Sequence, residues 1–448
     1  MAKRPQSSLS AREQKILIQA GLAYEAGDIY QAESLAGQIL QRHPHQFDAS
    51  YILAIVAVER ENPKARQLAL NLVPFLPQTA EHQFNMGVLF EKLRDFDSAA
   101  TYYRCSLQLR SDHFETLMAL GNCELALRHP DTAIELFETC RQLQPCDPRV
   151  WNNLGAAFNE TSCLDKAEKA YLEGQRLDPT SSFIQTGLAC VYGRMNRLDC
   201  AIPLLEEVIA NNPGYETAHF NYSAFLLISG QFKKGWPEYE WRRKTPVWKE
   251  DMPAMSQPEW QGEALLNKTL LIVCEQGIGD TIQFIRFLPK LLAMGATVAI
   301  ACEPILTPLL ACLNLPVQLI DKKTQASNFK ADFWLPLLSL ALRLDIDLLN
   351  PDSSPYIRIS DEKIRDASQK IHKHAPNATR KIGLIWAGNP RHSNDLNRSM
   401  HPGQFLPLAN LKETVFFSLQ KNGPGPQAYP ELKNLNIIDL APYLETLL

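Results

Sequence analysis

The chain has 448 residues, and its 45 Lys and Arg against 49 Asp and Glu give a net charge of −4. This length exceeds what one hydrophobic core usually serves, so we expect about two or three domains. Without a long basic block, nucleic acid is not an expected partner. There is no secretion signal and no run of about 18 apolar residues, so no membrane span is predicted. The ten cysteines form no C-x-x-C pair, which favours buried thiols in a reducing cytoplasm.

A 34-residue period runs through the first half of the chain. Three sets of residues keep it: Gly87, Gly121 and Gly155; Ala99, Ala133, Ala167 and Ala201; Pro145, Pro179 and Pro213. The small residues let two antiparallel helices approach closely, and aromatic residues fill the gaps between hairpins. The spacing resembles the tetratricopeptide repeat, with about six repeats and a drifting seventh. We therefore predict an all-α tetratricopeptide superhelix over 1–245, whose concave surface would bind a protein or peptide.

A connector rich in Trp and Pro, 246–267, follows the repeats. Four of the seven tryptophans lie close to it or within it, namely Trp236, Trp241, Trp248 and Trp260. The simpler interpretation is that these rings attach the last hairpin to the next domain. The alternative is that they form a shelf for an acceptor.

From Lys268 onward, short apolar strands alternate with helices. Leu270 to Cys274 reads as a buried parallel strand, and the helix after it has apolar residues on one side. This alternation predicts α/β structure, a doubly wound lobe over 268–375.

A glycine turn joins that first strand to its helix, with Gly277, Gly279 and Asp280 in sequence. Glycines at this point often cradle a phosphate, but the third glycine of a dinucleotide fingerprint is missing. Asp280 would also repel a phosphate there. Asp280 either caps the helix or acts as a general base at the carboxyl edge of the sheet, and the two roles are compatible.

A second, incomplete lobe is predicted over 376–448. A buried strand from Lys381 ends in a turn at Asn389 and Pro390, and the polar loop 391–400 follows. The loop supplies amides, hydroxyls and two arginines at the carboxyl end of a strand, where a diphosphate would bind. The alternative is a solvated connection.

These residues carry a resemblance to a known family. The segments are Trp260-Gln261-Gly262, the run from Glu275 to Phe287, Gly383 to Pro390 and Asn394 to Ser399. Together they look like the bacterial tetratricopeptide proteins that carry a glycosyltransferase domain similar to heptosyltransferases (family 9). A more distant similarity is to the O-linked N-acetylglucosamine transferases.

The resemblance implies a GT-B-like fold, in which the second lobe binds a nucleotide-sugar and the first meets the acceptor. It implies that Asp280 is the catalytic base. The residues assigned to substrate binding on this basis are Gly277, Gly279, Gln283, Arg286, Asn389, Arg398 and Ser399. No cofactor and no metal ion are expected, since Arg398, Asn389 and Ser399 would hold the leaving diphosphate.

One departure from the family is that its later segment, with a histidine, a glycine and an alanine that hold the nucleotide, has no counterpart before Leu448. We therefore expect either a fragment of an active transferase or a protein that has lost transfer activity. The first hypothesis is a glycosyltransferase that acts on a protein or glycan. The second is a repeat scaffold with a degenerate, inactive domain. A dinucleotide oxidoreductase is disfavoured by the missing third glycine.

Overall fold

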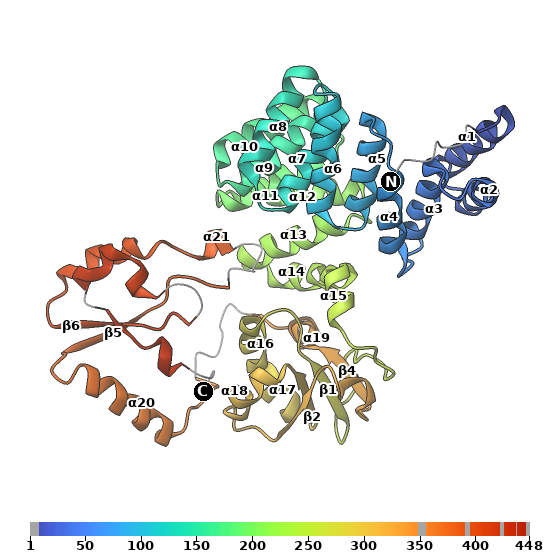
Figure 1. Ribbon diagram of the computed structural model, residues 1–448. Helices are drawn as coiled ribbons and strands as arrows, with labels where there is room; N and C mark the ends of the chain where they lie inside the picture. Colours follow the sequence, from blue (N-terminus) through green and yellow to red (C-terminus); the bar gives the residue numbers. More distant parts are fainter. Residues whose placement is uncertain (1–8, 348–354, 390–394, 422–424, 436, 445–448) are drawn as a thin grey trace. The chain divides into compact units, whose positions relative to one another are not determined.

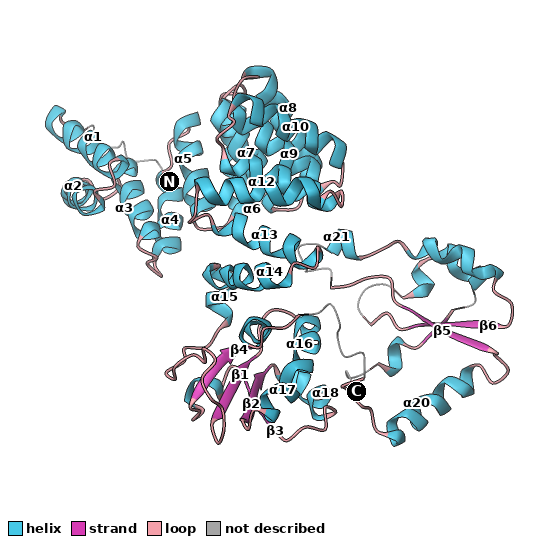
Figure 2. Ribbon diagram, turned by 180° about the vertical axis from the view of Figure 1, so that it is seen from behind, coloured by secondary structure: helices cyan, strands magenta, loops and turns pink. Residues whose placement is uncertain are grey.

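The computed structural model describes residues 9–347, 355–389, 395–421, 425–435 and 437–444. The chain divides into two compact units, Met1–Ser229 and Gly230–Leu448 (Figure 1). The first unit is helical, and the second contains two parallel sheets (Figure 2).

The first unit is a row of antiparallel helical hairpins, in which neighbouring helices in sequence pack together. Its helices are α1 (Ala11–Glu25), α2 (Ile29–Arg42), α3 (Phe47–Glu59), α4 (Ala65–Leu72), α5 (Ala80–Lys92), α6 (Phe96–Leu109), α7 (Phe114–Ala126), α8 (Pro130–Leu143), α9 (Pro148–Glu160), α10 (Leu164–Leu177), α11 (Ser182–Arg194), α12 (Leu198–Asn211) and α13 (Glu216–Ile228). The predicted superhelix of hairpins is therefore present.

Within a hairpin, a glycine on the first helix lies directly against an aromatic ring on the second. A methyl carbon added at Gly155 would lie 2.8 Å from the Tyr171 ring, and one added at Gly121 would overlap the Phe137 ring. Real methyl carbons do not come this close to a ring, so the two helices are held at a separation that only glycine permits. The 34-residue glycine register is thus a packing requirement.

The turn inside each hairpin follows the same register. One residue per turn has a positive φ, from Gly27 (79°) through Arg94 (58°), Arg128 (67°) and Ser162 (60°) to Asn196 (59°). A left-handed residue ends a helix by letting the next backbone N–H groups reach its last carbonyls, as Arg128 N–H does to Leu125 O at 3.1 Å. The turns therefore close by backbone geometry, although most of these residues are not glycine.

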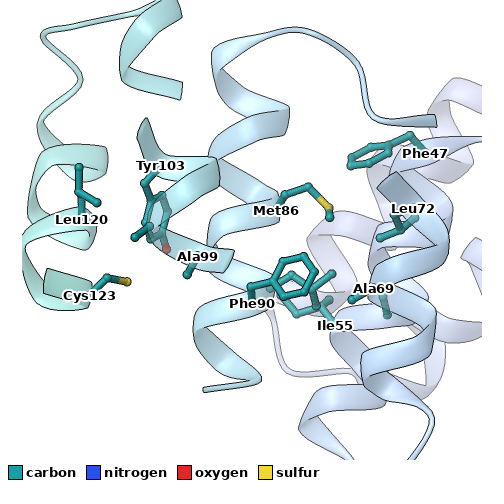
Figure 3. Packing of buried hydrophobic residues seen from close by; sticks show 13 residues of the cluster. Phe47, Ile55, Ala69, Leu72, Met86, Phe90, Ala99, Tyr103, Leu120 and Cys123 are labelled. Atoms are coloured by element: carbon teal, nitrogen blue, oxygen red, sulfur yellow. The ribbon is translucent and has the colours of Figure 1, made fainter. Parts of the chain in front are cut away.

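Neighbouring hairpins share one continuous apolar core. Figure 3 shows Met86 and Phe90 of α5 facing Ala69 and Leu72 of α4, while Tyr103 of α6 lies toward Leu120 of α7. Each hairpin thus buries an apolar face of the next, which is how repeat proteins build a core from units that lack one.

The second unit begins with helical segments and continues into a four-stranded parallel sheet. Its elements up to that sheet's end are α14 (Phe232–Tyr239), the 3-10 turn η2 (Glu240–Lys244), α15 (Pro246–Asp251), β1 (Thr269–Val273), α16 (Ile278–Phe284), α17 (Leu288–Ala293), β2 (Thr297–Cys302), α18 (Thr307–Ala311), β3 (Val317–Asp321), β4 (Phe333–Pro336) and α19 (Leu340–Arg343). The strand order is β3-β2-β1-β4, with Leu271 opposite Ala299 on one side and Trp334 on the other. The central strand is buried on both faces, as parallel sheets require.

The start of this unit differs from the predicted limit of the repeats at 245. Helix α14 belongs to the second unit, and Trp236 donates its indole N–H to the Ile346 carbonyl at 2.9 Å. Trp260 is also buried, at 1% exposure, and donates to the Glu263 carbonyl. Both rings are thus part of the packing of this unit.

A second parallel sheet, of three strands, lies in the same unit. Its strands and flanking helices are α20 (Asp361–His374), β5 (Arg380–Leu384), α21 (Asp395–Arg398), the 3-10 helix η7 (Pro402–Asn410), β6 (Thr414–Ser418) and β7 (Ile438–Asp439), in the strand order β5-β6-β7. The predicted boundary at 375 assigns α20 to the first lobe. Its Ile371, however, packs with Phe417 and Leu440 of the second sheet, which groups the helix with that sheet.

No helix in the described ranges combines the length and apolar character needed to span a membrane.

We predict that Gly121→Ala lowers stability. Overpacking a core costs about 1–3 kcal/mol, against a gain in helix propensity of about 1 kcal/mol. Circular dichroism during urea unfolding measures the change.

The matched control is Gly21→Ala, on α1 of the first hairpin. There the added carbon meets no neighbouring heavy atom within 4 Å in the described part of the chain, so stability should hold or rise. Equal urea midpoints for the two variants would contradict the packing requirement.

Candidate functional site

A groove crosses the first helices of four successive hairpins of the first unit. Helices α5, α7, α9 and α11 line a cavity of about 400 Å³, open to solvent on one side. Its lining residues include Phe84, Val88, Glu91, Glu115, Met118, Asn122, Arg149, Asn152, Asn153, Asp178, Phe183 and Ile184. Because equivalent helices supply them, the groove is a product of the repeat.

Three asparagine amides form a chain inside this groove. Asn152 donates to the Asn153 amide oxygen at 3.1 Å, and Asn153 donates to Asn122 Oδ1 at 2.9 Å. No other hydrogen bond within the described residues engages Asn122 Nδ2 or Asn152 Oδ1. The two ends of the chain therefore offer a donor and an acceptor, the pair that a peptide backbone needs.

The only guanidinium of the groove lining, among the described residues, is already paired. Arg149 donates to Asp147 at 2.7 Å and to Glu115 at 3.0 Å. These two carboxylates raise the pKa of Arg149, with the hydrogen bonds to Asp147 contributing most. Burial acts to raise the pKa of Asp147, but the bonds from Arg149 outweigh it and lower that pKa. Arg149 is thus a fixed part of the wall.

An exposed aromatic ring lies on α11. Phe183 is 68% exposed, and its ring meets the edge of Tyr215 with centroids 5.4 Å apart. Phe84, which is half-buried, adds apolar surface on α5. The groove therefore combines polar amides with places for apolar side chains.

The predicted base, Asp280, lies in the first turn of α16. Its Oδ2 accepts the Gly277 N–H at 3.0 Å, so it caps the helix. A carbon added at Gly277 would lie 3.1 Å from that oxygen, whereas Gly279 has no neighbour within 4 Å in the part of the chain described. Gly277, Gly279 and Asp280 thus share one turn at the carboxyl end of β1.

Gln283 and Arg286 follow on the same segment. Gln283 is exposed on α16, and Arg286 is partly buried with its guanidinium 4.9 Å above the Tyr356 ring. Tyr356 in turn donates its hydroxyl to the Ile282 carbonyl at 2.8 Å. Arg286 Nε is buried and has no hydrogen-bond partner within the described ranges.

The other predicted residues lie beyond β5 of the second sheet. Asn389 and Arg398 are exposed. Ser399 accepts the Gly388 N–H at 2.9 Å and donates to Asp395 at 2.8 Å, so it closes the loop onto the strand. Pro390 and the predicted polar residues 391–394 lie outside the described residues. The predicted site residues are therefore carried by two different sheets.

An ion-pair cluster that sequence analysis did not find lies at the carboxyl ends of β1 and β4. Arg242 is 2% exposed, and it donates to Glu275 Oε1 at 2.7 Å and Oε2 at 3.2 Å. The same guanidinium donates to Ser339 Oγ at 2.8 Å, and the Leu338 N–H donates to Glu275 at 3.1 Å. Trp248 also donates its indole N–H to Glu275.

This cluster occupies a significant point of the sheet. With strand order β3-β2-β1-β4, the chain reverses direction across the sheet between β1 and β4. Open parallel sheets bind ligands at such a switch point. In this protein the buried side chain of Arg242 lies at the switch point and pairs with Glu275. No signal in the sequence pairs Arg242 with Glu275, because both read as ordinary surface charges.

We predict that Arg242→Ala lowers the stability of the second unit by about 3–5 kcal/mol, because Glu275 would be left buried without its partner. Tryptophan fluorescence during urea unfolding follows the change, since Trp248 bonds to Glu275.

Lys268→Ala serves as control. It removes an exposed pair with Asp332 at 2.9 Å and should cost at most about 1 kcal/mol. If both variants unfold at the same urea concentration, the buried pair does not stabilise the second unit.

Residues 114–157 match the tetratricopeptide repeat family. This match assigns the hairpin of α7 and α8, with most of α9, to that repeat family.

Protein FlbA of Caulobacter vibrioides is 22% identical over 425 residues, which covers 82% of this chain and 70% of that protein. A solved tetratricopeptide repeat protein from Parabacteroides merdae is 14% identical, with a TM-score of 0.47 over 54% of this chain and 96% of its own. Pseudomonas aeruginosa pilF is 17% identical, with a TM-score of 0.41 over 48% of this chain and 97% of its own.

Proposed function

We propose that this protein is a repeat scaffold that binds a partner protein through an extended segment seated in the groove of α5, α7, α9 and α11. The observation that supports this proposal is the chain of three asparagine amides. Its ends leave a hydrogen-bond donor, Asn122 Nδ2, and a hydrogen-bond acceptor, Asn152 Oδ1. Extended backbone needs both kinds of group along its length.

The repeat architecture supports this function. A groove assembled from equivalent helices presents similar positions at regular intervals, which suits a chain laid across them. The apolar surface of Phe84 and Phe183 supplies anchoring area for side chains.

We predict that Asn122→Ala, Asn152→Ala and Asn153→Ala together weaken peptide binding at least about tenfold, because each lost hydrogen bond costs about 0.5–1.5 kcal/mol. The probe is the tightest member of a displayed random peptide library selected on the full wild-type chain. Fluorescence anisotropy of the labelled peptide gives the affinity.

The control combines Gln108→Ala and Gln142→Ala, which remove exposed amides on α6 and α8 outside the groove lining. It should bind as the wild type does. A library that yields no binder, or a triple variant that binds like this control, would overturn the scaffold function.

A second function, glycosyl transfer from a nucleotide-sugar, is favoured by one observation in the other unit. Two parallel sheets each end in a polar turn, at Asp280 after β1 and at Ser399 after β5. Here Asp280 would take a proton from an acceptor hydroxyl. Arg398 and Asn389 would hold the leaving diphosphate, while Gln283 and Arg286 would contact the acceptor.

We predict that Asp280→Asn lowers transfer or hydrolysis of a nucleotide-sugar by at least about 100-fold, since general-base catalysis contributes 10²–10⁴-fold. The amide oxygen of Asn can still accept the Gly277 N–H, so the cap is kept and the thermal midpoint should not move. Release of nucleoside diphosphate from a panel of UDP-, GDP-, ADP- and dTDP-sugars is the measurement.

Asp280→Ala is the companion variant, because it also removes the cap and should lose about 1 kcal/mol of stability. Turnover of no sugar in the panel by the wild-type chain would refute the transferase function and leave the scaffold function standing.

A cytoplasmic location is part of the proposal. All ten cysteines are unpaired, and burial raises the pKa of Cys274 to about 12. Such thiols suit a reducing compartment.

A further inference from the structure

We propose that the groove of α5, α7, α9 and α11 selects a positively charged segment, in which a Lys or Arg lies near an apolar side chain. The inference rests on the proposed scaffold function and adds the chemistry of the partner. It is carried by the charges that line the groove and by their pairing.

Acidic groups outnumber basic ones along the groove lining. The carboxylates of Glu91, Glu115 and Asp178 face one guanidinium, that of Arg149, among the described lining residues. The lining therefore carries a net charge of about −2 before any partner binds.

The positive charge of Arg149 is not available to a ligand. Its Nε and Nη2 lie 3.0 and 2.7 Å from Asp147 Oδ2, and its Nη1 and Nη2 lie 3.3 and 3.0 Å from the two Glu115 oxygens. All three guanidinium nitrogens thus donate to carboxylates. An incoming carboxylate would have to displace one of them, so an acidic segment or a chain terminus is disfavoured.

Two carboxylates remain without a cationic partner among the described residues. Glu91 accepts the Tyr103 hydroxyl at 2.6 Å, and Asp178 accepts the Thr180 N–H at 3.1 Å and its hydroxyl at 2.9 Å. These neutral donors fix the orientation of both carboxylates and leave their charge uncompensated. Glu91 lies on α5 and Asp178 directly follows α10, in the loop that leads to α11, so negative charge is present at both ends of the groove lining.

The apolar element of the partner has its own site. Phe183 follows Asp178 closely in the chain and is 68% exposed, and its ring is held against Tyr215. A fixed, exposed ring next to a carboxylate matches a side-chain pair of one apolar and one cationic residue, and the cation would also gain from the ring face.

The test begins with the peptides that a random displayed library yields on the full chain. Enrichment of Lys or Arg beside an apolar residue is the expected result. Binders enriched in Asp or Glu, or without charge bias, would overturn the inference, yet the scaffold function would survive if binding still needs the three asparagines. A library with no binder would overturn both.

The second arm uses Glu91→Gln with Asp178→Asn, measured by anisotropy with the selected basic peptide. Both amides still accept the hydrogen bonds from Tyr103 and Thr180, so the fold is kept, and circular dichroism checks this. Affinity at 50 mM salt should fall at least about fivefold, and the dependence of affinity on salt should weaken.

The matched control removes two charges elsewhere, by Glu135→Gln and Glu207→Gln on the exposed faces of α8 and α12. It should bind within about twofold of the wild type, because screened charges outside the groove act weakly. An equal loss of affinity in both double variants would show that net charge, and not the groove, attracts the peptide.

Discussion

The contact between a glycine and an aromatic ring, made inside three successive hairpins at Gly87, Gly121 and Gly155, is the constraint on which the middle of the first unit depends. At Gly155 and Tyr171 it leaves no room for a side chain, so it sets how closely the two helices of a hairpin pack. Hairpins of equal thickness stack regularly, and regular stacking aligns α5, α7, α9 and α11 along one groove. The groove therefore inherits its geometry from the core.

In the second unit, burial of Arg242 has the corresponding role. A guanidinium at 2% exposure must be paired, and Glu275 and Ser339 supply acceptors at the ends of β1 and β4. The pairing ties the segment before the sheet to the switch point.

Local sequence was sufficient for much of this architecture, because repeated small residues and strand-helix alternation report directly on packing. The sequence was insufficient where the backbone conformation of a turn, or a contact between residues far apart in the chain, determines the structure. Arg94 and Arg128 adopt a left-handed conformation because the hairpin turn requires it, although arginine has no preference for that region. Arg242 and Glu275 are 33 positions apart, and only the folded chain shows that they meet. Asp280 was open to two interpretations, and its bond to the Gly277 N–H establishes the cap while leaving the base a prediction.

In the candidate groove, too, the charges present in the sequence differ from the charges that remain available once ion pairs have formed. A count of charges along the sequence treats Arg149 as a free cation, but its two carboxylate partners convert it into a structural group. What remains to act on a ligand is the charge of Glu91 and Asp178, with the amides between them. Charge at such a surface mainly speeds encounter and rejects unsuitable partners, whereas amides and an exposed ring such as Phe183 supply the contacts that persist. Selectivity for a basic segment and affinity for an extended one would thus come from different residues of one groove.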